Sequence, residues 1–215
     1  MDPTAKTPED AIAAWRDALA ANPDCGVTHY NLGTAYLAQG RFTEAEAAFR
    51  QALALSPSLA EAYVQLGGLA MRQGDLDACL DCNEKARQAR PRFAIPYGNI
   101  GFVHLQRGDI AAAETALRRA LELEPKFVQA LATLGSALFM KGDIDGAEAQ
   151  SRRALDLEPN FGPAWNNLAL VALERRDYRG ARDFLDKAEA TGYEPHPDLV
   201  REIAAGLAGT PTGGA

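Results

Sequence analysis

Apolar residues follow a helical spacing within a unit of 34 residues that recurs along the chain. In the first unit, residues 26–59, one apolar helical face precedes Gly40 and a second follows it. The first face contains His29, Leu32, Gly33 and Tyr36, and the second contains Phe42, Ala45, Phe49, Ala52 and Leu53. Spacings of three and four residues are typical of one side of an α-helix. The unit therefore predicts a helix, a tight turn and a second helix.

Prolines mark the length of the unit. Pro23, Pro57, Pro91, Pro125 and Pro159 each lie 34 residues after the one before. A constant step of this size indicates a repeat array, in which each unit buries its apolar faces against its neighbours. The pattern predicts five whole units, which are residues 26–59, 60–93, 94–127, 128–161 and 162–195.

The N-terminal end carries half a unit. Residues 1–7 form a polar lead that we expect to be mobile, and residues 8–25 repeat only the second-helix pattern. Ala11, Trp15 and Ala18 fall one period before Ala45, Phe49 and Ala52. Such a half unit covers the otherwise bare apolar end of a stack of repeats.

The C-terminal end predicts a capping helix over residues 196–209, because Leu199, Ile203 and Leu207 share one side of a helix. The same helix could also be a displaceable autoinhibitory element. Residues 210–215 are small and polar, so we expect a disordered tail.

Glycine and aspartate recur at fixed places in the unit. Positions are counted from the first residue of each unit, so that Gly26 is position 1. Position 8 is glycine in four units, where we expect a close approach of the paired helix. The turn between the two helices has a glycine in four units, and glycine favours the left-handed conformation that ends a helix. These residues are Gly40, Gly74, Gly108 and Gly142. The aspartates that follow three of them, and Asp177 in the fifth unit, predict caps for the second helices. In the first unit, Thr43 and Glu46 have the spacing of a capping box instead.

The pattern resembles the tetratricopeptide repeat, whose signature has an aromatic residue at position 4, Leu-Gly at 7 and 8, Tyr at 11, Ala at 20, Phe at 24 and Ala at 27. The resemblance covers residues 8–192 and implies an all-α, right-handed α-solenoid of helix-turn-helix units whose first helices line a concave groove. Asn83 and Ser151 depart from the signature at position 24, and Arg87 departs at position 28. We expect poorer packing at those seams.

Position 6 of the units forms a row of polar side chains on the expected concave face. The row consists of Asn31, Gln65, Asn99, Thr133 and Asn167. A side-chain amide is both donor and acceptor, so it can pair with the N–H and C=O of an extended peptide. The row resembles the asparagine ladder in the tetratricopeptide superhelix of O-GlcNAc transferase. A solvated helix face is the alternative interpretation.

The rest of the expected groove is apolar, which is typical of an interaction surface. Its candidate binding residues are Tyr30, Val64, Met71, Phe102, Phe139 and Leu170, together with Asn166 at position 5 of the last unit. Family members that hold the acidic C-terminus of heat-shock chaperones use Lys and Arg at positions 2, 5 and 6. No basic residue stands there in the first three units, so a free carboxylate would lose its water without gaining a partner, which argues against that ligand. Self-association through the same surface is an alternative.

The net charge of −7 and the pI near 5.0 argue against nucleic-acid binding and against docking on anionic lipid. The sequence has no basic-then-apolar leader and no apolar stretch near the ~18 residues of a membrane span. These features predict a cytoplasmic protein with no membrane insertion.

Reactive residues do not assemble into a recognisable site. Cys79 and Cys82 form a C-x-x-C pair on a helix, but a zinc site needs about two more ligands. His104 falls at position 11, where Tyr36 stands in the first unit, and we expect it to be packed or half-exposed. We predict no enzyme activity, no metal and no cofactor.

The sequence therefore predicts a non-enzymatic scaffold or adaptor that holds a peptide or helix of a partner protein in its groove. Three alternatives stay open. The protein could be a chaperone for an aggregation-prone client, a homo-oligomeric structural scaffold, or a targeting arm for a glycosyltransferase on a separate chain.

Overall fold

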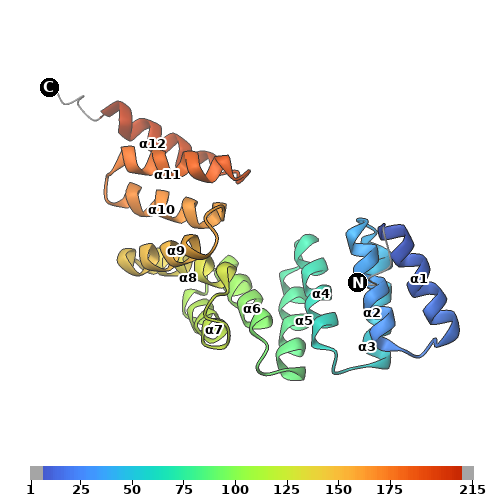
Figure 1. Ribbon diagram of the computed structural model, residues 1–215. Helices are drawn as coiled ribbons and strands as arrows, with labels where there is room; N and C mark the ends of the chain where they lie inside the picture. The colour runs from blue at the N-terminus through green and yellow to red at the C-terminus, as the bar shows by residue number, and fades with distance from the viewer. Residues whose placement is uncertain (1–6, 210–215) are drawn as a thin grey trace. The chain divides into compact units, whose positions relative to one another are not determined.

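The computed structural model describes residues 7–209, and these residues form twelve α-helices and no strand. The predicted mobile lead, apart from Thr7, and the predicted disordered tail lie outside the described residues. The chain divides into two compact units, one up to Val103 and one from His104, and the boundary falls within α6 (Ala94–Gln106). Helices paired in succession make this an all-α solenoid, as the sequence predicts (Figure 1).

The first compact unit begins with a single helix and continues with helix pairs. Its complete helices are α1 (Pro8–Ala21), α2 (Gly26–Ala38), α3 (Phe42–Leu55), α4 (Ala60–Arg72) and α5 (Leu76–Ala89). Helix α2 pairs with α3, and α4 pairs with α5. Helix α1 packs on α2, and α3 packs on α4, so the pair formed by α2 and α3 is flanked on both sides.

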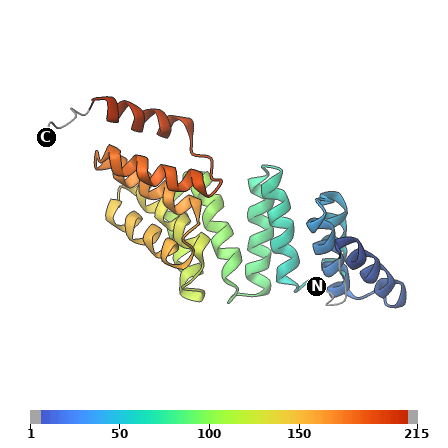
Figure 2. The ribbon, with the colours of Figure 1, turned by 45° about the horizontal axis from the view of Figure 1, so that its top comes forward.

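The second compact unit continues the same pattern. Its complete helices are α7 (Ile110–Leu123), α8 (Val128–Lys141), α9 (Ile144–Leu157), α10 (Gly162–Glu174), α11 (Tyr178–Ala190) and α12 (Pro197–Gly209). Helix α8 pairs with α9 and α10 with α11, while α8 also packs on α10. Helix α12 lies along α11 at the end of the stack (Figure 2). Among the described residues, no helix is both long and apolar enough to cross a membrane.

The second helices start in strict register. Their first residues are Pro8, Phe42, Leu76, Ile110, Ile144 and Tyr178, each 34 residues after the last. Helix α1 therefore has the register of a second helix. It buries Ala11 and Ile12 in a cluster with Leu32 and Tyr36 of the first whole repeat.

Aspartate caps the second helices, as predicted. The carboxylates of Asp75, Asp109, Asp143 and Asp177 each accept a hydrogen bond from the N–H three residues later. The prediction for the first repeat is wrong, because α3 begins at Phe42 and its N-cap, Arg41, makes no side-chain cap. Thr43 lies inside that helix. The capping box is instead at α1, where Thr7 and Asp10 each accept a hydrogen bond from the other's backbone N–H.

The turn glycines adopt the left-handed conformation that the sequence predicts. Gly40, Gly74, Gly108 and Gly142 have φ between 70° and 86°. The fifth repeat has Arg176 at this place with φ of 60°, a conformation that disfavours a side chain.

Position 8 faces position 24 of the same repeat, and this contact accounts for the glycines. A methyl group added at Gly33 would lie 2.6 Å from Cε1 of Phe49, and one at Gly67 would lie 2.5 Å from Nδ2 of Asn83. One at Gly135 would lie 2.7 Å from Oγ of Ser151. The expected close approach is confirmed. Asn83 and Ser151 are themselves fully buried.

Candidate partner-binding site

The first compact unit presents two amides of the predicted row with free hydrogen-bonding groups. Asn31 on α2 and Gln65 on α4 are half-exposed. Within residues 7–209, neither side-chain amide makes a hydrogen bond to the rest of the chain. Tyr30 and Val64, which precede them in the sequence, are exposed to a similar, intermediate degree. The Tyr30 ring packs against the Phe49 ring, with 5.7 Å between ring centroids.

The third member of the row is engaged inside the protein. Asn99 on α6 donates from Nδ2 to Oδ1 of Asn83, at 2.9 Å. Asn83 in turn donates to the backbone oxygen of Cys79 at 2.8 Å, so the buried amide is satisfied on both sides. Asn99 therefore links the second and third repeats.

The last member of the row is the most deeply buried. Asn167 on α10 is 4% exposed, and its Nδ2 donates to the backbone oxygen of Ala132 at 2.8 Å. Its Oδ1 accepts from Oγ of Ser136 at 2.9 Å. Both partners lie on α8, so Asn167 joins the fourth and fifth repeats. In this structure its amide is therefore engaged within the chain and not free to pair with a peptide.

The two remaining polar candidates, Thr133 and Asn166, make no side-chain hydrogen bond to another repeat among the described residues. Thr133 is half-exposed, and its hydroxyl donates to the backbone oxygen of Gln129 on its own helix. Asn166 is half-buried, and its Oδ1 is buried without a hydrogen-bond partner in the described part of the chain. A buried amide oxygen without a partner is costly unless something pairs with it.

The residue at position 24 of the preceding repeat accounts for which position 6 amides are hydrogen-bonded to a neighbouring repeat. Asn31, Gln65 and Thr133 follow the large apolar residues Trp15, Phe49 and Leu117, whereas Asn99 and Asn167 follow Asn83 and Ser151. A large apolar side chain fills the seam and offers no hydrogen bond. A short polar one leaves room for the next repeat's carboxamide to turn inward. Sequence reasoning noted both departures but did not connect them with the row.

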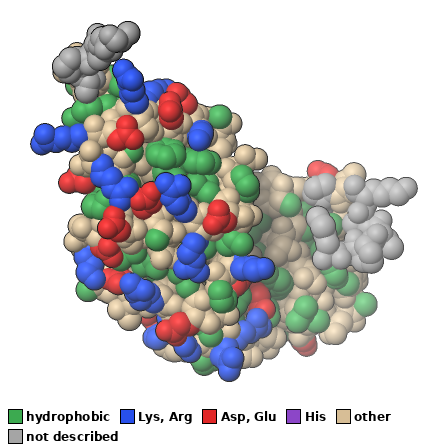
Figure 3. All heavy atoms as spheres, turned by 60° about the vertical axis from the view of Figure 1, so that its left-hand side comes forward, with side chains coloured by type: hydrophobic (Ala, Val, Ile, Leu, Met, Phe, Trp, Pro, Cys, Tyr) green, Lys and Arg blue, Asp and Glu red, His purple; other side chains and the backbone are tan. Residues whose placement is uncertain are grey.

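The apolar candidates are partly covered. Phe102 is 37% exposed, while Met71, Phe139 and Leu170 are half-buried. Met140, beside Phe139, is 57% exposed. On the face drawn in Figure 3, acidic and basic side chains are interspersed, and hydrophobic side chains are exposed between them. A surface with mixed charge and exposed apolar groups favours protein contacts over a highly charged ligand.

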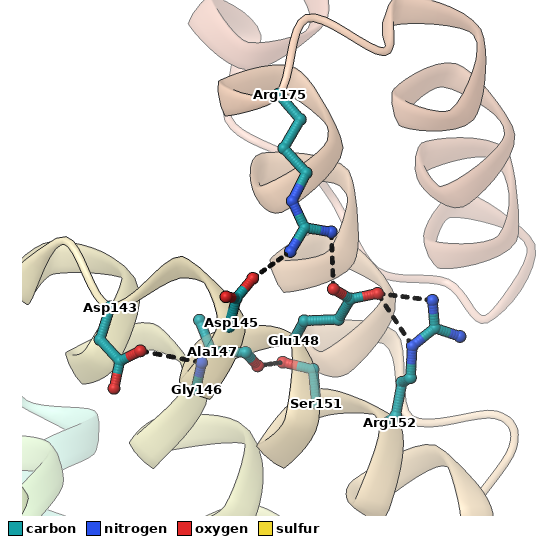
Figure 4. A network of polar contacts seen from close by, with 8 residues as sticks. All are labelled: Asp143, Asp145, Gly146, Ala147, Glu148, Ser151, Arg152 and Arg175. Atoms are coloured by element: carbon teal, nitrogen blue, oxygen red, sulfur yellow. Dashed lines mark hydrogen bonds and ion pairs between the residues drawn. The ribbon is translucent and has the colours of Figure 1, made fainter.

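Ion pairs bridge successive repeats in the second compact unit. Glu148 on α9 accepts from Arg152 at 2.6 Å and from Arg175 of the next repeat at 2.6 Å, and Arg175 also reaches Asp145 (Figure 4). Hydrogen bonds from Arg152 and Arg175 lower the pKa of Glu148. Glu114 has the same arrangement with Lys141 and Arg118, which lower its pKa.

The cysteines are free thiols. Cys79 is buried at position 20, and Cys82 is half-buried, where burial raises the pKa of its thiol. In the described part of the chain, no group of three or more His, Cys, Asp or Glu side chains is placed to hold a metal ion. His104 lies 3.6 Å from the Asp109 carboxylate and is partly exposed.

A sequence-family model identifies the repeats. The model described as "Tetratricopeptide repeat" matches residues 7–60, 30–92, 101–160 and 142–195. The chain therefore belongs to the tetratricopeptide repeat family. Proteins of this family are generally non-enzymatic scaffolds that bind other proteins. A search of curated proteins finds no match to the chain.

Solved structures share the fold. YrrB, whose structure is described as a tetratricopeptide repeat protein with an unusual peptide-binding site, is 24% identical, with 91% of this chain and 98% of that chain covered and a TM-score of 0.67. PilF of Pseudomonas aeruginosa is 21% identical over 92% and 86% of the two chains, with a TM-score of 0.70. A chain of the APC/C hetero-tetramer Cut9–Hcn1 is 22% identical, with a TM-score of 0.81 over 94% of this chain and 40% of that one. At these identities the likeness is one of fold.

Proposed function

We propose that the chain is a non-enzymatic scaffold that binds a segment of a partner protein along the first helices of its repeats. The observation that carries the proposal is the pair Asn31 and Gln65, which present unpaired amides from the same position of two consecutive repeats. Each amide can accept from a peptide N–H and donate to a peptide C=O. Such a pair holds an extended backbone with little regard to its sequence.

Apolar neighbours would give the site its side-chain preference. Tyr30 and Val64 precede the two amides, and Phe102 is the large aromatic residue exposed on the same compact unit. In the second compact unit, Thr133, Phe139, Asn166 and Leu170 are the corresponding candidates.

Asn99 and Asn167 take a different role in this proposal. Their amides hold adjacent repeats together through Asn83, Ala132 and Ser136, so a ligand would have to break those bonds to use them. The candidate binding amides are therefore Asn31 and Gln65 in the first compact unit, and Thr133 is a separate candidate in the second. The peptide-binding site described for YrrB, which shares the fold, supports a peptide as the class of ligand.

The test is a peptide selected on the wild-type chain from a random displayed library and then measured by calorimetry. Asn31→Ala combined with Gln65→Ala should weaken peptide binding roughly thirtyfold, because the two substitutions remove at least two hydrogen bonds of about 1 kcal/mol each. The matched control is Gln51→Ala with Gln88→Ala, which removes two exposed amides from second helices. The control should bind as wild type.

Unchanged affinity in the Asn31/Gln65 variant would reject the amide row. If no peptide is selected and the mass in light scattering rises with concentration, self-association is the function of this surface. Suppressed aggregation of an unfolded client, without a selected peptide, would favour the chaperone alternative. Each alternative predicts a different readout from the same preparation.

A further inference from the structure

Position 11 of the first repeat is filled by a buried tyrosine. Tyr36 on α2 is 6% exposed, and its hydroxyl accepts hydrogen bonds from Nε and Nη2 of Arg16 at 3.2 and 2.9 Å. The guanidinium carbon of Arg41 lies 4.5 Å from the centre of the ring. The phenol is thus held at a seam, with its oxygen paired to an arginine of the preceding helix.

The same position of the fifth repeat is Ala172, and a surface cavity of about 180 Å³ lies beside it. Arg152 stands four repeats after Arg16, and Asp177 stands four repeats after Arg41. Both line the cavity. The cavity therefore corresponds to the place that the Tyr36 ring occupies in the first repeat. Ala172 lines the cavity and Ser151 does not, so the small residue at position 11, and not the short residue at position 24, borders the space.

The floor of the cavity is apolar. Leu168 and Val171 of α10 are buried, and Phe184 of α11 stacks on Trp165 with 5.9 Å between ring centres. An apolar cavity of about 150 Å³ can hold benzene. The surface cavity beside Ala172 has a comparable volume of about 180 Å³, so one aromatic ring fits it in size, and it is smaller than the roughly 300–1,000 Å³ of a drug-sized site.

The rim of the cavity is charged but balanced. It carries two cations, Arg152 and Arg175, and two anions, Glu148 and Asp177. Glu148 lies between the two arginines, and Arg152 points toward it from α9 and Arg175 from the C-cap of α10 (Figure 4). A ligand with a full charge of either sign would meet a like charge here. A neutral hydroxyl can accept from a guanidinium and donate to a carboxylate.

We propose that this cavity, which we call the phenol pocket, binds a tyrosine side chain of a partner protein. The ring lies on the apolar floor, and Arg152 donates to the phenolic oxygen through Nη1, because its Nε and Nη2 already donate to Glu148. The occupant is a protein tyrosine because the chain itself places one in the matching space of its first repeat. The pocket is independent of the Asn31 and Gln65 amides, so it can act as a second contact for one partner or as a contact for another.

The fourth repeat provides an internal control for the pocket. Leu138 stands at position 11 there and is buried. Glu114, Arg118 and Lys141 form the same bridge of charges that Glu148, Arg152 and Arg175 form one repeat later. Arg118 is therefore matched to Arg152 in its ion pairs, but it has a filled position 11 beside it.

The test is a titration of the full chain with N-acetyl-tyrosinamide and N-acetyl-phenylalaninamide, followed through the backbone amide resonances. Tyrosinamide should produce saturable chemical-shift changes in α10 and α11. It should bind about fivefold more tightly than phenylalaninamide, because one hydroxyl hydrogen bond contributes about 1 kcal/mol. Arg152→Gln should remove that preference. Arg118→Gln should leave it unchanged.

Filling the pocket from within should abolish binding. Ala172→Tyr restores the arrangement of the first repeat, and Ala172→Leu copies the fourth repeat in case the larger ring disturbs folding. Equal binding of the two amides, binding that persists in a folded Ala172 variant, or no saturable shift would each overturn the proposal. Binding of 4-methylphenol without tyrosinamide would also overturn it, because the pocket would then admit a free phenol and not a protein side chain.

Discussion

Asn31 and Asn167 occupy the same position of the first and fifth repeats, yet they lie in different environments. Asn31 is half-exposed with an unpaired amide, whereas Asn167 is 4% exposed and bonded at both ends of its amide to α8. The preceding position 24 is Trp15 in one case and Ser151 in the other. The position 6 amide thus forms hydrogen bonds inside the chain where its neighbour at position 24 of the preceding repeat is polar, and at Asn167 it is also buried.

The comparison shows that the repeated carboxamides are not one functional set. At two seams the amides of Asn99 and Asn167 form hydrogen bonds to the preceding repeat. At the others the position 6 side chains are left on the surface. Substituting the whole row together would therefore mix a loss of binding with a loss of stability. Paired substitutions at equivalent positions separate the two effects.

The largest difference should come from the same change at the two asparagines. Asn167→Asp removes the donor to the Ala132 oxygen and places a charge in a buried site. It should lower the free energy of unfolding by about 3 kcal/mol. Asn31→Asp should change it by less than about 0.5 kcal/mol. Urea unfolding followed by circular dichroism measures both, and equal losses would remove the distinction between the two sites.

A smaller difference should separate the helix starts of the two regions. Asp143 caps α9 by accepting from the Gly146 N–H at 2.9 Å (Figure 4), whereas Thr43 makes no cap in the first repeat. Asp143→Ala should therefore cost about 1 kcal/mol. Thr43→Ala should cost close to nothing. A stability loss at Thr43 comparable with that at Asp143 would mean that α3 starts as the sequence alone predicts.

The smallest difference concerns the ion pairs. Glu148 bridges two repeats, and its side chain is 23% exposed, whereas Glu46 in the first repeat pairs only with Arg50 on its own helix among the described residues. Glu148→Gln should cost roughly 1 kcal/mol and Glu46→Gln less than about half of that, because exposed pairs contribute little. Thermal unfolding at neutral pH gives both values.

The pH dependence of the same variants has a defined sign. Hydrogen bonds from Arg152, and then Arg175, lower the folded-state pKa of Glu148 below its ordinary value of 4.5. Its contribution to stability is therefore present above pH 4.5 and is lost as the pH falls through the lowered pKa. The stability gap between wild type and Glu148→Gln should close on acidification. A gap that stays constant down to about pH 3 would contradict this account.

Helix caps and turns were predictable from the sequence where a single residue type determines them. The 34-residue step of the prolines predicts the helix pairs, and glycine at Gly142 and aspartate at Asp143 predict the turn and the cap that the structure contains. Thr43 shows the limit of such reasoning. Its spacing to Glu46 suits a capping box, but the turn places Arg41 at the N-cap.

The amino-acid sequence by itself determined the repeat length, the helix pairs and the residue types at each repeat position, because these depend on spacing along one chain. Tertiary structure decided which of the equivalent residues are exposed. Burial of Asn167 depends on the size of Ser151 and on the polar groups of α8. A cavity lies beside Ala172, whereas the first repeat places the Tyr36 ring at the same repeat position. These properties arise from contacts between repeats, which no single repeat contains.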